Sequence, residues 1–593
     1  MKKMMILMML MASMVATTAC STEDPFSDNN SWNYSSGNNS GFTGGSNGSS
    51  TTTGELTTFT IDIDKTTAEP TATANEYFPD ADEDPLENNS FGTEVYIDLS
   101  NPTASTADGV EITVNGGHIT ANHGSTKGIC YVLNGTTSNG SFTVVGDKKY
   151  EVKLNNVSIT NPDSAALNLL SKKRAYIVLA DGTTNMLADG TTSQNDHKGA
   201  LYSKGKLLFN GSGSLSVTGN YNNGIHSTDY IVFRKGNNVY VKSTKNHGIK
   251  ANDGVYINGG ILNVEVSAAA AKGINCESHI EVNGGRTTVI TTGNGTYDTE
   301  DREAKGAAGI KADSTFTING GELWLKSTGT GGKGLKADMD ADINGGSVYI
   351  ITQGSQYKSN NDTASPKGIK IDGDLNIKGG TIWVRTSGTN GEGIESKSTL
   401  NISGGEVAVY AYDDAINSSS HMTISGGYVF AQGQHNDGID ANGNMYIKGG
   451  VVYAVCSGSP EVALDANTEG GYKLYVTGGT IVAVGGLENG SSLSQSCYQA
   501  SSWSANTWYA MTYGSSTFSF KTPSSGGSGL VVSAFSTPSL QSGISVSGGT
   551  SYFGGIGNMG GTVSGGSTES LSSYTASSMG GGGFPGGGRP GGW

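Results

Sequence analysis

A pair of glycines that recurs at nearly constant spacing constrains this chain more than any other feature. From Gly259 onward the steps between successive pairs are 25, 36, 25, 34, 25, 22, 23 and 29 residues. Eleven residues before most pairs stands a Gly or Ala followed by Ile or Leu. Self-similarity at a period of 20–50 residues is typical of a stacked repeat array. The array therefore has to be understood before any single motif.

One unit shows what each repeat builds. In Gly309–Asp313, Phe316–Ile318 and Glu322–Leu325, apolar residues alternate with polar ones, which predicts three short strands and no helix. The glycine pair supplies the turn between the second and third strand. Three strands per repeat predict one coil of a parallel β-helix, in which each strand pairs with its equivalent in the next coil, ~4.8 Å away. We expect an all-β solenoid of more than ten coils over residues 59–570.

Composition and charge exclude several other classes. The 91 Gly come with only 12 Pro and no triplet repeat, which excludes collagen. The formal net charge of −16 argues against nucleic acid as a partner. The two long steps in the repeat are insertions, at Asn294–Ala308 and Gln353–Lys367. Loops leave such a stack at the coil corners, and long ones often carry function.

The N-terminus carries targeting signals. Two lysines precede an apolar run that is too short to span a membrane, as in a secretory signal peptide over residues 1–19. Small residues before Cys20 resemble a lipobox, which predicts lipidation of Cys20; ordinary cleavage after Ala19 is the alternative. Residues 20–58 read as a flexible tether. We expect a surface-exposed outer-membrane lipoprotein that meets the membrane only through its lipid, with a disordered Gly-rich tail over residues 571–593.

Stacked coils turn equivalent positions into surface stripes, and one stripe is basic. It contains Lys272 and two lysines on each of two consecutive coils. An aspartate follows two residues after some of these lysines, so the stripe predicts either a lattice of ion pairs or a track for an anionic polymer. In the second interpretation the track uses Lys272, Lys333 and Lys367, which the ion-pair lattice would leave unpaired. The candidate glycan-binding lysines are Lys333, Lys336, Lys367 and Lys370.

A second stripe is aromatic. Trp324, Tyr349 and Trp383 occupy equivalent outward positions on consecutive coils, with Lys326 and Arg385 on the same strands. Aromatic faces bind the C–H faces of sugars, and the cations favour carboxylates, so we expect a binding strip for acidic glycan. The alternative is a structural ladder of rings beneath the two insertions. In that case the edge with Lys272, Lys333 and Lys367 is the next candidate.

A third stripe is acidic and offers only oxygen ligands. Asp413 and Asp414 are expected to stack on Asp437, with Asp440 nearby. Like charges ~5 Å apart repel by about 1–3 kcal/mol, so the stripe predicts a calcium site rather than a transition-metal site. A solvated acidic edge is the alternative. The acidic run Asp80–Asp84 has the same two interpretations, with a solvated loop favoured.

The coils themselves resemble a known family. Segments such as Gly332–Asp338, Glu392–Lys397 and Asn436–Ala441 are similar to coils of a secreted bacterial carbohydrate-binding domain family. The resemblance implies a right-handed parallel β-helix similar to that of pectate lyases, calcium as a bound cofactor, and plant polysaccharide, polygalacturonate or cellulose, as partner. It implies calcium ligands only where the acidic residues match, at Asp413, Asp414, Asp437 and Asp440.

Three functions remain open from the sequence. The first, which we favour, is a non-enzymatic cell-surface protein that binds acidic polysaccharide without cleaving it. The second is a calcium-dependent polysaccharide lyase, with Lys336 or Lys370 as the base; the acidic stripe lies several coils from both, which disfavours it. The third is an adhesin or a structural spacer.

Overall fold

The computed structural model describes residues 59–63, 68–70 and 75–576. The predicted signal peptide, the lipidation site Cys20, the tether over residues 20–58 and most of the Gly-rich tail lie outside these residues, so the corresponding predictions stay predictions. In the described part of the chain, no helix has the length and apolar character needed to cross a membrane.

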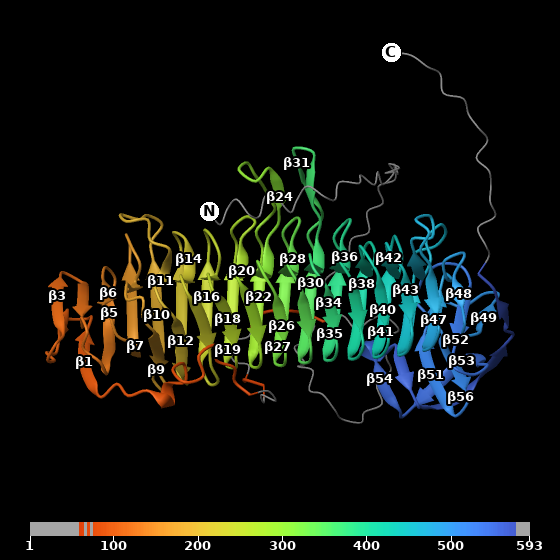
Figure 1. Ribbon diagram of the computed structural model, residues 1–593, viewed down its shortest axis with the longest axis horizontal. Helices are drawn as coiled ribbons and strands as arrows, with labels where there is room; N and C mark the ends of the chain where they lie inside the picture. Colours follow the sequence, from red (N-terminus) through yellow and green to blue (C-terminus); the bar gives the residue numbers. More distant parts are fainter. Residues whose placement is uncertain (1–58, 64–67, 71–74, 577–593) are drawn as a thin grey trace, which may run out of the picture. The chain divides into compact units, whose positions relative to one another are not determined.

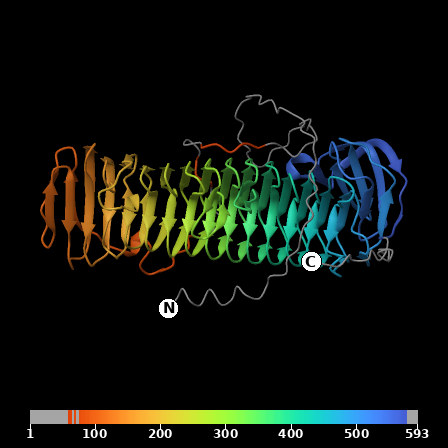
Figure 2. The ribbon, with the colours of Figure 1, turned by 90° about the horizontal axis from the view of Figure 1, so that it is seen from above.

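The described chain winds into the predicted parallel β-helix, with coils stacked one on the next (Figures 1 and 2). One row of strands forms a 15-stranded sheet, parallel throughout except for its first pair. Its members, in order, are β3 (Glu111–Asn115), β4 (His118–Asn122), β6 (Ser141–Val145), β8 (Leu167–Leu169), β11 (Gly199–Ser203), β14 (Asn223–Ser227), β17 (Ile249–Ala251), β20 (Lys272–Cys276), β25 (Ala308–Ala312), β28 (Lys333–Ala337), β33 (Lys367–Ile371), β36 (Glu392–Ser396), β39 (Ile416–Ser418), β42 (Ile439–Ala441) and β45 (Leu464–Ala466).

A 32-stranded sheet supplies the other two strands of each coil. The first coils use β1 (Thr93–Asp98), β2 (Thr103–Ala104), β5 (Ile129–Thr137) and the long β7 (Tyr150–Asn161). The row that follows the 15-stranded sheet holds β9 (Ala175–Leu179), β12 (Leu207–Gly211), β15 (Tyr230–Phe233), β18 (Gly254–Ile257), β21 (His279–Val282), β26 (Phe316–Ile318), β29 (Ala341–Ile343), β34 (Leu375–Ile377), β37 (Leu400–Ile402), β40 (Met422–Ile424), β43 (Met445–Ile447), β46 (Leu474–Val476) and β48 (Ser492–Leu493). The row after the glycine turn holds β10 (Thr184–Asp189), β13 (Ser214–Gly219), β16 (Asn238–Ser243), β19 (Ile261–Val266), β22 (Arg286–Thr291), β27 (Glu322–Ser327), β30 (Ser347–Thr352), β35 (Thr381–Thr386), β38 (Glu406–Ala411), β41 (Tyr428–Gly433), β44 (Val451–Val455) and β47 (Thr480–Val484).

The inward positions stack as the alternation predicts. Ile318 pairs with Ile343 and Ile343 with Ile377, and all three side chains are buried in one continuous core. The second glycine of each pair lies in the left-handed region, as in Gly321, where φ is +78°. A Cβ there would lie 2.7 Å from the backbone of Gly284, so the turn requires glycine for space as well as for conformation.

The C-terminal end differs from the expected solenoid. Parallel pairing ends at β48, and the chain continues in antiparallel strands rather than coils up to residue 570. They bury a second core around Tyr453, Phe518 and Phe520, which covers the last coils as the end of an apolar array requires. The first residues of the expected tail, 571–576, also contain a paired strand. The strands are β49 (Cys497–Ala500), β50 (Trp508–Tyr513), β51 (Ser516–Lys521), β52 (Leu530–Ser533), β53 (Ser539–Ser547), β54 (Thr550–Tyr552), β55 (Gly557–Met559), β56 (Thr562–Glu569) and β57 (Ser572–Tyr574), with the 3-10 turn η2 (Phe553–Gly555).

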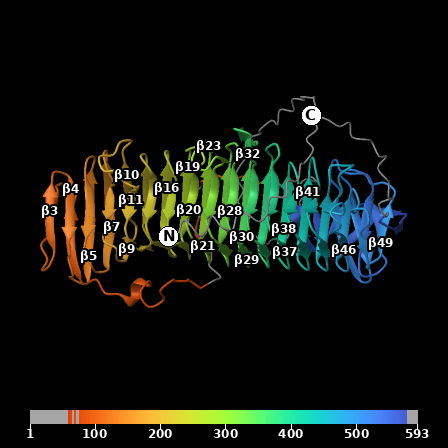
Figure 3. The same cartoon turned by 45° about the horizontal axis from the view of Figure 1, so that its top comes forward.

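An N-terminal strap, which we define as the described residues from 59 to 91, lies along the 32-stranded sheet (Figure 3). It contains the 3-10 turn η1 (Leu86–Asn88) and the acidic run Asp80–Asp84. That run is anchored rather than free in solvent: Arg174 contacts Asp80, Glu83 and Asp84, and Asp84 is fully buried. A second arginine, Arg234, binds two further strap carboxylates. The strap therefore docks by ion pairs.

Candidate functional site

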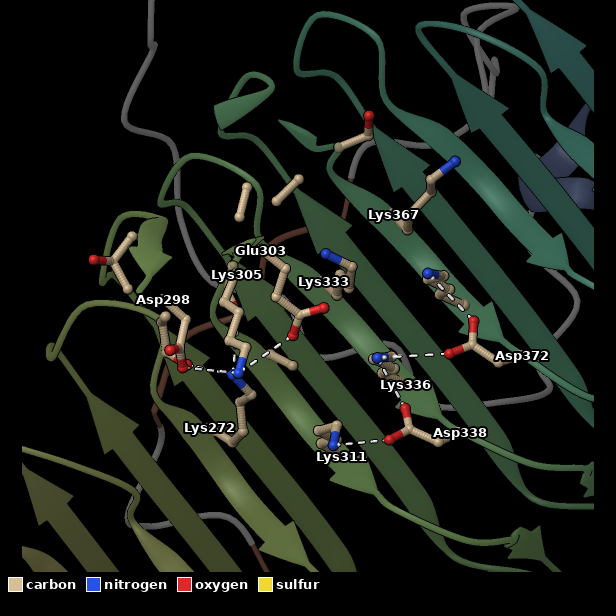
Figure 4. A pocket seen from close by; sticks show the side chains of 18 of the residues that line it. Lys272, Asp298, Glu303, Lys305, Lys311, Lys333, Lys336, Asp338, Lys367 and Asp372 are labelled. Carbon is tan, nitrogen blue, oxygen red and sulfur yellow. Dashed lines mark hydrogen bonds and ion pairs between the residues drawn. The ribbon is translucent and has the colours of Figure 1, made fainter. Parts of the chain in front are cut away.

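The predicted basic stripe lines a cavity of about 830 Å³ on the 15-stranded sheet (Figure 4). Strand register brings the lysines together, because β28 pairs with β33 so that Lys333 lies beside Lys367 and Lys336 beside Lys370. Lys272, on β20, lies two strands earlier in the same sheet. We call this cavity the lysine pocket; its eight lysines are Lys272, Lys305, Lys311, Lys333, Lys336, Lys367, Lys370 and Lys397.

The two insertions form the rim of the lysine pocket. The first is a hairpin of β23 (Thr296–Asp298) and β24 (Glu303–Lys305), and the second a hairpin of β31 (Tyr357–Ser359) and β32 (Asp362–Ala364). They are joined to each other, since the Ala304 N–H donates to Asp362 Oδ2 at 2.7 Å. Both insertions were predicted from the repeat spacing, and each contributes residues that line the cavity.

Much of the basic stripe is an ion-pair lattice. Lys311 Nζ lies 3.0 Å from Asp338, and Lys336 Nζ bridges Asp338 at 2.8 Å and Asp372 at 3.6 Å. Lys370 completes the row with Asp372 at 3.2 Å. Aspartates and lysines thus alternate across consecutive coils. These lysines are neutralised by the aspartates and have little charge to spare for a ligand.

Lys367 does not stay outside the lattice, contrary to the sequence-based expectation. Its Nζ lies 2.5 Å from Glu392 and 3.2 Å from Glu395, both on the following strand, β36. Glu395 is almost fully buried and also pairs with Lys397. The column that is basic at Lys333 and Lys367 turns acidic at Glu392, so the neutralising partner is simply the next residue along the stripe.

Lys272 and Lys333 are different. Within the described part of the chain, neither amine has an ion-pair partner: Lys272 Nζ donates to the carbonyls of Ala270 and Gly306, and Lys333 Nζ donates to Gly331 O at 3.1 Å. Burial, together with neighbouring lysines, lowers the pKa of each amine to about 7. The pocket therefore contains two amines with which an anionic ligand would pair, and this pairing would favour their protonation by solvent.

The aromatic strip is a ladder whose faces are occupied. Trp324 and Tyr349 stack on each other with ring centroids 4.1 Å apart, and Arg286 lies over Trp324 at 4.8 Å. Tyr349 and Trp383 pack edge to face, and Phe59 of the strap contacts both, at 5.8 and 6.2 Å. Trp324 and Tyr349 face each other along the stack and Trp383 packs against Tyr349 with its edge, so the rings contact one another rather than presenting open faces to a sugar. The cover is the strap rather than the insertions.

The two cations beside the strip are engaged as well. Lys326 donates to Ile61 O at 3.1 Å and lies 3.5 Å from Asp62, both in the strap. Arg385 lies 4.7 Å over the ring of Tyr410. The predicted residues Trp324, Tyr349, Trp383, Lys326 and Arg385 are thus brought together, but as a docking surface for the strap and as part of the coil packing.

The acidic stripe is assembled as expected, with its carboxylates held by amides. Asn417 Nδ2 donates to Asp414 Oδ2 at 3.1 Å and to Asp440 Oδ2 at 3.2 Å, while Asn436 Nδ2 donates to Asp413 at 3.0 Å. Burial raises the pKa of Asp437 to about 8 and that of Asp440 to about 7. Among the described residues, no three His, Cys, Asp or Glu side chains converge as a metal-binding group.

A family model places the chain among known proteins. The model, described as "Carbohydrate-binding domain-containing protein", matches residues 115–270, 265–331, 328–390 and 384–521, which together cover more than half of the chain and include the whole lysine pocket. The chain belongs to the carbohydrate-binding domain family. The resemblance seen in the coil segments is confirmed by this match.

Individual relatives are more distant. A carbohydrate-binding domain-containing protein from Acetivibrio thermocellus is 32% identical over 120 residues, which is 19% of this chain and 42% of the relative, so the chain spans less than half the length of that curated relative. A solved structure of a polysaccharide lyase-like protein from C. thermocellum, a gadolinium derivative, is 23% identical, with a TM-score of 0.32 over 48% of this chain and 96% of that one.

Some pocket residues were missed in the sequence. Lys305 lies in the first insertion, where Asp298 and Glu303 pair with it, and His247 lines the cavity and accepts from the Lys272 N–H at 3.0 Å. The alternation of acids with Lys305 in the insertion was a usable signal for an ion-paired hairpin. His247 had a signal too, because it stands one residue before Gly248, in the same column as Lys272, Lys333 and Lys367.

Proposed function

We propose that this member of the carbohydrate-binding domain family binds acidic polysaccharide in the lysine pocket and does not cleave it. The observation that carries the proposal is the pair Lys272 and Lys333, two half-buried amines without a carboxylate partner in a cavity of about 830 Å³. Every other lysine of the pocket has at least one carboxylate partner. A ligand with carboxylates supplies what these two lack.

The size and polarity of the pocket suit a short stretch of an acidic polymer. Cavities of ~300–1,000 Å³ accommodate drug-sized ligands, which corresponds to a few sugar units. The lining is mainly charged side chains rather than open aromatic faces. We therefore favour a uronate polymer such as polygalacturonate over a neutral one such as cellulose.

The test is titration calorimetry of the wild-type chain with oligogalacturonate at low and high salt. Lys272→Gln combined with Lys333→Gln is expected to weaken binding by about tenfold or more, since each tenfold loss is ~1.4 kcal/mol. Lys358→Gln is the matched control, because Lys358 is an exposed lysine on the β31–β32 hairpin that does not line the pocket. Equal affinity of the double variant and the wild type would place the glycan elsewhere.

A polysaccharide lyase is the second candidate function, and the amine of Lys333 favours it. A neutral amine near pH 7 accepts the proton next to a uronate carboxylate; the C–O bond to the leaving sugar then breaks, and a C=C bond forms. The base in this version is Lys333, because Lys336 and Lys370 are tied to aspartates. Ultraviolet absorbance of unsaturated uronides measures the reaction. An absorbance that rises with the wild type but not with Lys333→Gln would show that the protein is a lyase and not only a binding protein.

Calcium at Asp413, Asp414, Asp437 and Asp440 stays a prediction. The buried carboxylates with raised pKa values favour a neutralising cation, but amide groups now occupy several of their oxygens. An ion would need Asn417 to present its oxygen instead of its nitrogen. No step of the binding proposed here uses this ion.

Surface attachment is likewise a proposal from the sequence. Cys20 and the tether lie outside the described residues, and the support is the lipobox-like segment alone. Cys20→Ser should move the protein from the outer-membrane fraction to the periplasm or medium. Unchanged fractionation would exclude lipidation.

A further inference from the structure

A serine, a histidine and an aspartate form a continuous hydrogen-bonded chain in the loop between β10 and β11. Ser193 Oγ lies 2.9 Å from His197 Nδ1, and His197 Nε2 lies 2.8 Å from Asp189 Oδ2. Both distances are within the range that couples a nucleophile to its base and the base to a third group that orients it. None of the three residues belongs to the lysine pocket.

The aspartate fixes which nitrogen of the imidazole carries the proton. An ionised carboxylate only accepts, so His197 must donate its Nε2–H to Asp189, which leaves Nδ1 as the acceptor. The one hydroxyl proton of Ser193 then has two acceptors in reach, Nδ1 at 2.9 Å and Asn195 Oδ1 at 3.4 Å. The shorter contact orients the hydroxyl toward the base.

Burial is graded along the chain of three groups. Asp189 and His197 are buried, and Tyr221 packs over the imidazole with ring centroids 4.8 Å apart, whereas Ser193 is partly exposed. The Asn220 N–H donates to the other carboxylate oxygen of Asp189 at 2.5 Å. The imidazole is thus held between a buried carboxylate and an aromatic ring, while Ser193 keeps partial exposure to solvent.

We propose that Ser193, His197 and Asp189 form a nucleophilic triad that hydrolyses small acyl esters carried on carbohydrate hydroxyls. The partial exposure of Ser193 suits an acyl group that projects from a polymer. An ester suits it better than an amide, because an alkoxide leaving group needs less protonation than an amine. This activity goes beyond glycan binding and is independent of the lysine pocket.

The chemistry balances with water as the only co-reactant. Ser193 Oγ attacks the ester carbonyl while its proton passes to His197 Nδ1; the C–O bond to the sugar breaks, and the sugar oxygen takes that proton. Water then attacks the acyl-serine by the same base, releasing the carboxylic acid and restoring Ser193. The Asn195 N–H donates to Ser193 Oγ at 3.3 Å in the resting protein, and during the attack it would have to shift to the oxyanion that forms on the carbonyl.

The position of the triad relates it to the glycan. Its loop leads directly into β11 of the 15-stranded sheet, and three pairing steps along that sheet lead to β20 and Lys272. At ~4.8 Å per step this is about 15 Å along the coil stack. A polysaccharide that extends from the lysine pocket along the 15-stranded sheet, toward the first coils, would pass the loop between β10 and β11.

The experiment uses the full chain with 4-nitrophenyl acetate and, separately, a fluorophosphonate probe, both without glycan. Peptide mass spectrometry should find the phosphonate on Ser193, and hydrolysis should fall about 100-fold or more in Ser193→Ala and His197→Gln. Ser164→Ala is the matched control, since Ser164 Oγ also donates to Asn195 Oδ1, at 3.0 Å, but has no histidine partner.

The alternatives are separable. If Ser193 only closes the turn, by accepting the N–H groups of Asn195 and His197, then Ser193→Ala lowers the melting temperature while wild type shows no labelling and no hydrolysis above Ser193→Ala; that result overturns the proposal. Because no glycan enters these assays, their failure leaves binding in the lysine pocket untouched. The Asp189→Asn variant should lose most of the hydrolysis while its circular dichroism spectrum shows that it is folded.

Discussion

Two side chains decide the electrostatics of the lysine pocket. Lys272 and Lys333 are flanked by other cations and buried enough to lower the pKa of each amine to about 7, whereas their neighbours are neutralised by aspartates. An isolated charge costs more in such a place than a paired one. These two amines therefore respond to pH and to ligand, and the paired lysines do not.

Binding of oligogalacturonate should weaken as pH rises from 6 to 8.5. Below pH 7 both amines are protonated before the anion arrives; above pH 7 each must take up a proton on binding, and that uptake costs more as pH increases. Calorimetry at constant ionic strength measures the trend. Lys272→Arg combined with Lys333→Arg should flatten it, because guanidinium stays charged. A wild-type affinity that is equal at both pH values would contradict the assignment.

Trp324→Ala should cost stability and spare binding. The ring is sandwiched between Tyr349 and Arg286, so its removal is expected to lower the free energy of unfolding by about 1–3 kcal/mol, less than for a fully buried ring. Thermal melting measures this loss, and calorimetry on the same sample should give the wild-type affinity. Loss of binding with an unchanged melting temperature would return the glycan to the aromatic strip.

At the scale of the strand and its turn, the sequence was most informative. The glycine pairs and the Ile columns set coil length, register and inward face, so Ile318, Ile343 and Ile377 were placed correctly from spacing alone. Equivalent outward residues were also placed side by side correctly. What spacing could not predict was what covers them, because Phe59 and Arg174 are about 290 and 90 residues from their partners in sequence. Nor does a column of rings reveal whether the rings face outward or stack.

The acidic strands should make the folded protein less stable as pH rises. Burial raises the pKa of Asp437 to about 8, above its unfolded value, so the folded state holds a proton that the unfolded state has lost between about pH 4 and 8. This contribution is present at low pH and disappears as pH passes through 8. Asp437→Asn should therefore raise the melting temperature at pH 8.5 and change it little at pH 5.

Calcium provides the companion measurement on the same strands. If it binds at the acidic stripe, it should raise the wild-type melting temperature more at pH 8.5 than at pH 5, because protons compete for the same oxygens. Asp437→Asn should reduce that increase. An identical calcium effect at both pH values would argue against these four carboxylates as ligands.

For the whole solenoid, Arg174 is the most consequential residue of the strap interface. Asp84 is fully buried against its guanidinium, so Arg174→Met should destabilise the docked strap by about 3–5 kcal/mol. Limited proteolysis with mass spectrometry should then find cleavage within residues 59–91 while the coils stay intact. Lys149→Met, which removes a more exposed partner of Glu83, serves as the control. Equal protease resistance of both variants would mean that the arginine does not hold the strap.

The strap also determines where a pulling force enters the protein. Among the described residues, Phe59 is the first along the chain to contact the coils, beside Trp383 on β35, well before the first coil begins at β1. Tension applied to the strap at Phe59 therefore loads the middle of the stack, not its first coil. To reach that coil it must break the contacts of Phe59, then the pair of Arg234 with Glu76, then those of Arg174, and last the pair of Arg234 with Glu87. A solenoid pulled by its first strand would unwind coil by coil. In this protein the contacts of the strap must break before the first coil is loaded.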